Sequence, residues 1–296
     1  MRRTAACTAA LVLAATLAAG VAACGGGAPA EARAASTATP PALRHLPARR
    51  AVVWAVGDGS DTAAGTRALA RAIVRADPDL FLYLGDVYET GTPEQFRRGY
   101  DALYGRIARR TAPTPGNHEY GNRAEGYDPY WRSKLGGPVP PYYAVRTAGW
   151  TLLSLNSEDA HDPASAQAAW LALRLSAPGT CRIAFWHRPR FSAGTHGDQA
   201  DVAPLWDALG GRAVLALGGH DHASQRFRAV DGVTQIVAGA GGHSSYPLRP
   251  DRRLAFGDTG TPAALRMVLA PGVADLSFRR ADGTVIDRTR VRCRRR

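Results

Sequence analysis

Short apolar runs that end beside glycine, aspartate or histidine recur along the first two thirds of the chain. Runs of this length, rich in β-branched, leucine and aromatic residues, predict buried strands. Each of the clearest runs is followed at once, or within three positions, by an aspartate or a histidine, whose side chains can bind metals or transfer protons. The strands are expected at 51–57, 79–85, 182–186 and 213–217, and the residues that follow them are Asp58, Asp86, His187 and His220.

Apolar residues at spacings of three and four lie between these runs and predict helices. The helices are expected at 61–76, 93–109, 163–175 and 200–209. Further strands are expected at 142–145, 150–156, 225–230, 233–239, 264–270, 273–279 and 284–292. This order, with α/β alternation first and a strand-rich end, predicts one mixed α/β domain over residues 49–296, without an internal linker.

The N-terminus has the pattern of an export signal. Two arginines precede an apolar run at 9–23 that is too short to span a membrane comfortably. Cys24 follows small residues at the end of this run, which resembles the lipobox of bacterial lipoproteins and implies lipidation of Cys24. We expect a signal peptide at 1–23, a flexible tether at 24–48, and an extracytoplasmic protein anchored to the cell membrane. Plain secretion after cleavage near Ala23 is the alternative.

The cysteines fit an oxidising compartment. Cys7 would leave with the signal peptide and Cys24 would carry the anchor, so Cys181 and Cys293 remain as an even pair. We predict a disulfide between these two residues, which would join the end of the chain to a central strand. Two unpaired buried thiols are the alternative.

Composition excludes some classes of protein and leaves others open. The chain has 296 residues, 45% of them hydrophobic and 21% charged, which excludes a mostly disordered protein. Its formal net charge is +12, carried almost wholly by arginine, since Lys134 is the only lysine. The arginines are spread along the sequence apart from residues 294–296, so they predict no organised nucleic-acid stripe. We therefore do not expect nucleic acid as the main partner, and a nuclease stays open as an alternative.

Five polar clusters indicate a metal site. Carboxylates, an amide oxygen and imidazoles are the ligands that Fe, Mn and Zn accept, and a carboxylate can bridge two ions roughly 3.5–4 Å apart. A dinucleotide-binding fingerprint is excluded because the first cluster lacks the third glycine. The clusters are Gly57-Asp58-Gly59, Gly85-Asp86-Val87-Tyr88, Gly116-Asn117-His118-Glu119, His187-Arg188-Pro189 and Gly219-His220-Asp221-His222.

In this order the five clusters resemble those of the calcineurin-like metallophosphoesterase superfamily, over roughly residues 50–260 and nearest the purple acid phosphatase-like branch. The resemblance implies a four-layer αββα sandwich in which two mixed β-sheets are flanked by helices. It also implies two metal ions, each Fe, Mn or Zn. By this resemblance the first ion is bound by Asp58, Asp86 and His222. Asp86 bridges to the second ion, which is completed by Asn117, His187 and His220. The resemblance places His118 beside the leaving group.

Two departures from the family pattern concern the first ion. Many members have a histidine where this chain has Ser60, and the purple branch compensates with a tyrosine three residues after the bridging aspartate. Here Tyr88 is only two residues after Asp86. Either the loop brings Tyr88 to the metal as a ligand, or Tyr88 packs or contacts substrate.

Two further histidines are candidates for substrate contact. His196 lies in a loop where the family often places a substrate-facing histidine, and His243 follows a glycine-rich run. A plain surface loop is the alternative for both.

We expect a hydrolase of phosphate esters in which two metals activate a water to hydroxide and a small phosphorylated substrate is attacked in line. His118 would protonate the leaving oxygen, and Glu119 would orient His118. Phosphomonoesterase and phosphodiesterase activities both stay open. The alternatives are a nuclease of the same fold and a catalytically silent metal-binding lipoprotein. We expect a monomer.

Overall fold

The computed structural model describes residues 37–61, 63–178 and 181–293. The expected signal peptide, the proposed lipidation site Cys24, the first part of the tether and the arginines at 294–296 lie outside the described residues. Within the described part of the chain, no helix is both long enough and apolar enough to cross a membrane.

The first of two β-sheets has six strands in the order β13-β12-β11-β1-β2-β3. β1, β2 and β3 are parallel, whereas β11, β12 and β13 continue the sheet in antiparallel fashion from the other side of β1. The strands are β1 (Ala51–Val56), β2 (Leu80–Tyr83), β3 (Thr111–Pro113), β11 (Ala263–Ala270), β12 (Val273–Arg280) and β13 (Val285–Arg292).

The second sheet has seven strands in the order β10-β8-β9-β7-β6-β5-β4. Its centre, from β5 through β6 and β7 to β9, is parallel, and antiparallel strands close both ends. The strands are β4 (Tyr143–Thr147), β5 (Trp150–Ser154), β6 (Cys181–Phe185), β7 (Leu215–Gly218), β8 (Ser224–Phe227), β9 (Thr234–Ala238) and β10 (Leu254–Asp258).

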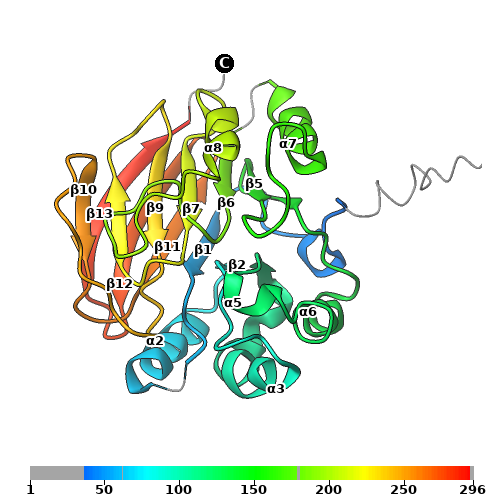
Figure 1. Cartoon of the computed structure of the whole chain (residues 1–296), viewed down its shortest axis with the longest axis vertical. Coiled ribbons are helices and arrows are strands. Elements are labelled where there is room, and N and C mark those ends of the chain that lie inside the picture. The colour runs from blue at the N-terminus through cyan, green and yellow to red at the C-terminus, as the bar shows by residue number, and fades with distance from the viewer. Residues whose placement is uncertain (1–36, 62, 179–180, 294–296) are drawn as a thin grey trace, which may run out of the picture.

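The helices lie outside the two sheets, around β1–β3 and beside β5–β7 (Figure 1). α2 buries Leu69 and Ile73, the residues at helical spacing that predicted it. The predicted helix at 93–109 is instead a series of short pieces, because glycines at 99 and 105 weaken a continuous α-helix. The helices are η1 (Pro41–Leu43), α2 (Ala64–Arg75), α3 (Pro93–Gln95), η2 (Phe96–Asp101), α4 (Ala102–Tyr104), η3 (Gly105–Arg110), α5 (Asn117–Tyr120), α6 (Tyr127–Leu135), α7 (Ala166–Ser176) and α8 (Ala203–Leu209).

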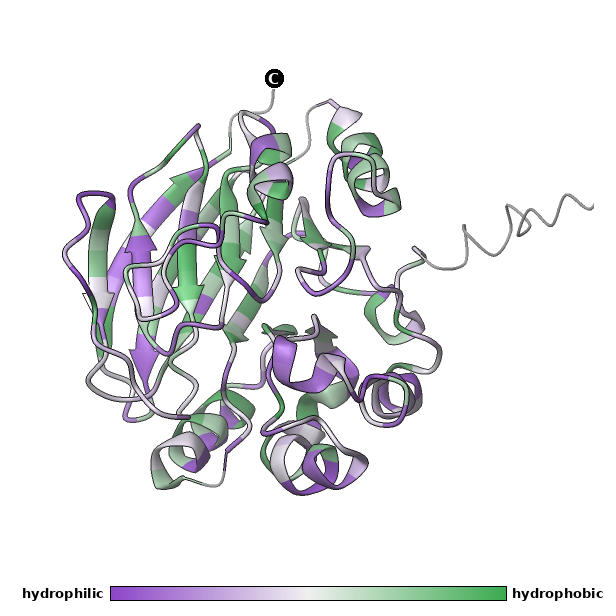
Figure 2. Ribbon diagram, viewed as in Figure 1, coloured by the Kyte–Doolittle hydropathy of each residue, from purple (hydrophilic) through white to green (hydrophobic). Residues whose placement is uncertain are grey.

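Alternating side chains of the central strands build two hydrophobic layers. Ile183 of β6 joins Val53 and Met267 of the first sheet in a core between the sheets. Its neighbour Ala184 points the other way, into a second cluster with Trp170 of α7 and others from α8. Figure 2 shows the hydrophobic colour concentrated on these central strands and hydrophilic stretches on the helices around them. The prediction of a mixed α/β fold with two mixed sheets flanked by helices is confirmed.

Several short elements were not predicted from the sequence. β3 has three residues, β10 alternates between half-buried and exposed positions, and α5 is one turn long. None of them carries enough apolar periodicity to be recognised. α6 was also missed, since its buried residues are aromatic and widely spaced: Tyr127, Trp131 and Leu135.

The second part of the expected tether packs on the domain. Leu43 in η1 is buried, and the Thr39 hydroxyl donates a hydrogen bond to the Ala144 carbonyl at 2.7 Å. Leu46 also packs against the core. The Pro47 carbonyl accepts hydrogen bonds from the Thr147 hydroxyl and the Ala148 backbone. The structure therefore differs from the expectation over 37–48, because composition does not reveal these partners.

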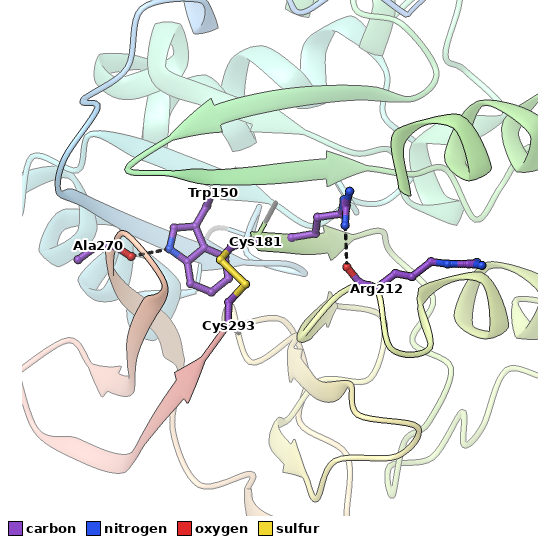
Figure 3. Close-up of a disulfide and its surroundings, with 6 residues drawn as sticks. Trp150, Cys181, Arg212, Ala270 and Cys293 are labelled. Atoms are coloured by element: carbon purple, nitrogen blue, oxygen red, sulfur yellow. Dashed lines mark hydrogen bonds between the residues drawn. A yellow bond between two sulfur atoms is a disulfide. The ribbon is translucent and has the colours of Figure 1, made fainter. Parts of the chain in front are cut away.

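The predicted disulfide between Cys181 and Cys293 is present, and it links the two sheets (Figure 3). Cys181 begins β6 in the second sheet, and Cys293 follows β13 at the edge of the first, with 5.6 Å between their Cα atoms. Beside it the Trp150 indole donates a hydrogen bond to the Ala270 carbonyl at 2.8 Å, which also joins the sheets. The strand β13 is thereby fixed at its far end.

We predict that the Cys181→Ala/Cys293→Ala double variant is less stable than the wild type by about 2–5 kcal/mol. The reason is that the bond closes a loop with a sequence separation of 112 residues, which restricts the unfolded chain. Urea unfolding under non-reducing conditions measures the difference, and reduced wild type is the matched control. Equal midpoints for variant and oxidised wild type would show that the bond contributes nothing.

Candidate metal centre

Loops that follow five strands bring the predicted polar residues to one edge of the two sheets. β1, β2 and β3 end before Asp58, Asp86 and Asn117, while β6 and β7 of the second sheet end before His187 and His220. The carboxyl ends of parallel strands meet at one edge, which is where open α/β sheets place their ligands. The chain therefore gathers its acids and histidines at the junction of the two sheets.

One half of the site is a buried group formed by Asp86, His187 and His220. Donor atoms of these three residues lie within 4.8 Å of one another. His187 Nε2 is 3.4 Å from Asp86 Oδ1 and 3.1 Å from Asn117 Oδ1. His187 Nδ1 donates to the Leu84 carbonyl at 2.7 Å, which fixes the ring and turns Nε2 toward the cluster. This geometry unites residues from both sheets.

The other half is formed by Asp58, Tyr88 and His222. The Tyr88 hydroxyl donates to Asp58 Oδ1 at 2.8 Å and lies 2.9 Å from His222 Nε2. His222 Nε2 is also 3.5 Å from Asp58 Oδ1. Despite its shortened spacing from Asp86, Tyr88 therefore reaches the side chains expected around the first ion. Asp58 Oδ2 accepts a hydrogen bond from the His220 backbone N–H at 2.9 Å and so connects the two halves.

The backbone at the site adopts uncommon conformations. Asp58, Asp86 and His220 have φ values of 58°, 68° and 68°, in the left-handed region that non-glycine residues rarely occupy. Each such residue costs of order 1–3 kcal/mol, and strain of this kind is concentrated at functional sites. Gly116 permits the close approach, because a Cβ there would lie 2.0 Å from Asp86 Oδ1.

Burial and neighbouring charges shift the pKa values of the site in opposite directions. Burial alone would raise the pKa of Asp86, but the charge and hydrogen bond of His187 outweigh it and hold that pKa well below its usual range. Burial alone would lower the pKa of His187, but the charge and hydrogen bond of Asp86 outweigh it and raise that pKa to about 10. Burial and the nearby His187 lower the pKa of His220 to about 2, so that His220 is neutral and offers a lone pair.

The donor set fits divalent or trivalent transition metals. It combines carboxylate, amide and phenol oxygens with imidazole nitrogens, and no cysteine takes part. The side chains of Asp58 and His187 are fully buried, and His220 and His222 are each 5% exposed. Buried carboxylates and imidazoles this close together are typical of a site that needs a cation. Asp86 belongs to the first group, and its charge also acts on Tyr88 and His222 of the other.

Glu119 supports the loop of Asp86. Its buried carboxylate accepts hydrogen bonds from the backbone N–H groups of Asp86 and Val87 at 3.1–3.2 Å. Burial, followed by the charge of Asp86, raises the pKa of Glu119 to about 8. The sequence led us to expect Glu119 to orient His118, but its carboxylate hydrogen-bonds to the backbone of the Asp86 loop, because adjacent residues of the short helix α5 point in different directions.

His118 lies at the open side of the centre. Its side chain is 34% exposed, and its Nε2 is 3.9 Å from Asp86 Oδ2. The ring Nδ1 donates to the Glu89 carbonyl at 2.7 Å, which orients the imidazole. The ring also packs edge-on against Tyr88, with 4.6 Å between centroids. His118 is therefore next to the centre without lying inside the buried ligand group.

The two histidines predicted to contact substrate, His196 and His243, both lie at the centre. His196 stacks on His220 with 4.1 Å between ring centroids. His243 stacks on Tyr88 at 3.9 Å, and its Nδ1 is 3.0 Å from Asp61 Oδ2. The structure thus brings both into contact with predicted metal ligands.

Tyr246 was missed by the sequence reasoning. Its ring stacks on His222 at 4.2 Å and meets His196 edge-on at 5.2 Å. A single tyrosine in a polar loop, three residues after His243, gives no signal in the sequence.

Comparison with known proteins agrees with this geometry. A family model described as calcineurin-like phosphoesterase matches residues 51–224, more than half of the chain. Among solved structures, the chain is similar to the purple acid phosphatase PPD1 of yellow lupin (Lupinus luteus), with a TM-score of 0.70 and 17% identity over 83% of this chain and 54% of that one. It thus spans only about half of the lupin enzyme.

Two further structures share the fold. One is GAP50, described as the anchor in the inner membrane complex of Plasmodium, with a TM-score of 0.68 and 13% identity over 83% of this chain and 90% of that one. The other is a dimetal phosphatase from Danio rerio, with a TM-score of 0.55 and 14% identity over 81% of this chain and 98% of that one. Comparison with curated proteins gives no match. Because the family model matches more than half of the chain, including the loops from Asp58 to His222, the chain belongs to the calcineurin-like phosphoesterases, a family of metal-dependent hydrolases of phosphate esters.

Proposed function

We propose that this phosphoesterase works outside the cytoplasm and holds two metal ions between the loops of its two sheets. The observation that carries the proposal is the convergence of Asp86, His187 and His220 within 4.8 Å, next to the hydrogen-bonded group of Asp58, Tyr88 and His222. Two adjacent sets of oxygen and nitrogen donors joined by one carboxylate suit a binuclear centre.

Each set of donors would hold one ion. Asp58, Tyr88 and His222 would hold the first, and Asn117, His187 and His220 the second, with Asp86 shared between them. The ions would be Fe, Mn or Zn. Bound there, they would supply Lewis acidity to a phosphate oxygen and lower the pKa of a water toward about 7.

The protein's own residues would position the substrate and handle the leaving group. His118 is held through Nδ1 by the Glu89 carbonyl, so its Nε2 faces the centre, where it would give a proton to the departing oxygen. Glu119 is a positioning residue, because it fixes the backbone of the Asp86 loop. His196 and His243 would contact the substrate from the rim of the centre.

The substrate would be a small phosphorylated molecule. Beside His222 and His243 lies a hollow of about 260 Å³, also lined by Ser244, Thr259 and Thr261, which gives room for an ester group next to the phosphate. This space would accept the alcohol part of a monoester or one arm of a diester.

The extracytoplasmic part of the proposal has two supports. The N-terminal sequence has the pattern of an export signal that ends at Cys24, the proposed lipidation site. The Cys181–Cys293 disulfide is of the kind that persists in oxidising compartments. A lipid on Cys24 would hold the enzyme at the outer surface of the cell membrane, and without it the enzyme would be secreted.

We predict that Asp86→Asn lowers hydrolysis of aryl phosphates by at least about 10²–10³-fold, because one carboxylate serves both halves of the centre. A panel of aryl mono- and diesters across pH, together with metal content per chain, measures the effect. His45→Ala is the matched control, since His45 is exposed and distant from the centre in sequence. Full activity with unchanged metal content in Asp86→Asn would refute this centre. Wild-type protein that binds no metal would favour a catalytically silent module.

His118→Asn should affect substrates according to their leaving groups. For an alkyl phosphate, whose leaving alkoxide needs a proton, kcat should fall about 10²–10⁴-fold. For p-nitrophenyl phosphate, whose leaving group departs readily without a proton, the fall should be much smaller, and metal content should stay unchanged. An equal loss for both substrates would argue that His118 acts on the phosphate or the metals instead.

Tyr88→Phe tests whether the phenol is a ligand. The resemblance to the purple branch implies a visible absorption band when a tyrosinate binds ferric iron. The iron-loaded wild type should show this band, and the iron-loaded variant should lose it while keeping its fold by circular dichroism. Zinc-loaded wild type is the colourless control. A band that persists in Tyr88→Phe, or an iron-loaded wild type without one, would assign Tyr88 to packing or substrate contact.

A further inference from the structure

A hollow lined by arginines lies on the outer face of the first sheet. It measures about 460 Å³ and is formed by β11, β12 and β13. Alternate residues of these strands, such as Met267 and Leu276, enter the hydrophobic core. Arg266 and its neighbours on the other strands project from the opposite face. The arginines that line the hollow are Arg266, Arg279, Arg288 and Arg290.

Sheet register explains how residues scattered in sequence come together. Arg266 pairs with Ser277, and Ser277 pairs with Arg288, so that the three form one row across three strands. Neighbouring strands are about 4.8 Å apart, which separates the two arginines by about 10 Å. Arg290 extends the row along β13 by about 7 Å, two residues further on. The sequence shows no arginine stripe because this row runs across strands.

The hollow carries more positive charge than its carboxylates can neutralise. Asp275 forms an ion pair with Arg290, and the guanidinium of Arg279 donates to the Ser277 hydroxyl at 3.1 Å. Arg266 and Arg288 have no ion pair among the described residues. Four arginines against one aspartate leave an excess of three positive charges.

The excess of positive charge acts on Arg266 through its arginine neighbours. Arg266 is partly buried, and its pKa is lowered first by burial and then by the charges of Arg279 and Arg50. A guanidinium with like charges around it gains stability when an anion binds, because the repulsion is then screened at short range. Arginine also presents a planar fork of donors that matches phosphate oxygens.

We propose that this hollow, the arginine groove, binds a linear polymer of phosphate groups through its guanidinium groups. A chain with regularly spaced phosphates would meet the guanidinium groups in turn along the row. The lining contains no aromatic residue on which a base could stack, so nucleosides gain nothing there. The arginine groove faces away from the second sheet and is separate from the metal centre.

A flat membrane surface fits the arginine groove less well. Arg266 and Arg279 are recessed and partly buried, which suits a narrow chain better than a plane of head groups. Leu173 of α7, at 69% exposed, is the large hydrophobic side chain most exposed in the described part of the chain, and α7 packs on the second sheet. Among the described residues, the apolar side chains that line the groove are Val268, which is half-buried, and Leu276, which is buried, so neither protrudes for insertion into lipid.

The experiment measures binding of labelled inorganic polyphosphate to the metal-loaded protein by fluorescence anisotropy over a range of salt concentrations. The variant Arg266→Gln/Arg288→Gln removes two guanidinium groups from the groove. The control Arg109→Gln/Arg132→Gln removes the same charge from two exposed positions on η3 and α6. The metal centre is intact in both, so the difference between them reports the groove.

We expect the groove variant to bind polyphosphate at least about tenfold more weakly, and its salt slope to fall by about two, roughly one for each arginine. The control should change affinity by less than about twofold, and both should keep wild-type melting temperature and hydrolysis of p-nitrophenyl phosphate. Oligothymidylate of matched charge should bind no better than polyphosphate.

Four results would overturn the proposal. These are equal weakening in the two variants, no wild-type binding at physiological salt, tighter binding of oligothymidylate than of polyphosphate, and groove-dependent binding to phosphatidylglycerol vesicles. The third would indicate recognition of nucleosides, and the fourth a membrane surface.

Discussion

The hydrogen bond from the His220 backbone to Asp58 joins the two sheets at the candidate metal centre, and the geometry around it depends on this contact. Asp58 follows β1 of the first sheet, whereas His220 follows β7 of the second. The other oxygen of Asp58 meets Tyr88 and lies near His222, so one fully buried carboxylate fixes groups from two other loops, the one after β2 and the one after β7. A charge this deep requires such partners, since an unpaired buried carboxylate would be far too costly. Asp58 and His220 both have left-handed backbone conformations, which accompany the close approach of the His220 N–H to the Asp58 carboxylate.

Around this contact, residues outside the predicted ligand set orient the predicted ligands. Leu84 and Glu119 act through backbone contacts: the Leu84 carbonyl orients His187, and Glu119 holds the N–H groups of the Asp86 loop. Ser244 is 3.0 Å from the far nitrogen of His222 and plays the same part there. Such supporting contacts set which nitrogen of each imidazole faces a metal. The chemistry of the centre thus rests on residues that would never touch an ion.

Much of the architecture was predictable because apolar runs at strand and helix periods are long in this chain. The strands that lead to Asp58, Asp86, His187 and His220 were expected close to where they occur, and the motif order placed their side chains at one edge. What the sequence did not reveal depends on contacts distant along the chain. The stacking of Tyr246 on His222, the attachment of Glu119 to the Asp86 loop and the arginine groove all arise from pairing between separate segments. Periodicity reports which face of an element is buried, and it contains no information on what lies opposite.

The position of β1 has a consequence for how the protein is made. β1 lies in the middle of its sheet, between β2, which soon follows it in the chain, and β11, where Ala51 pairs with Leu269. Loop closure over such a separation is slow, and the sheet cannot be completed until almost the whole chain has left the ribosome. Until then the edge of β1 is exposed and competent for incorrect pairing. Folding that waits for the last strands would suit the export that we propose from the N-terminal sequence, because the late arrival of β11 delays formation of the compact domain.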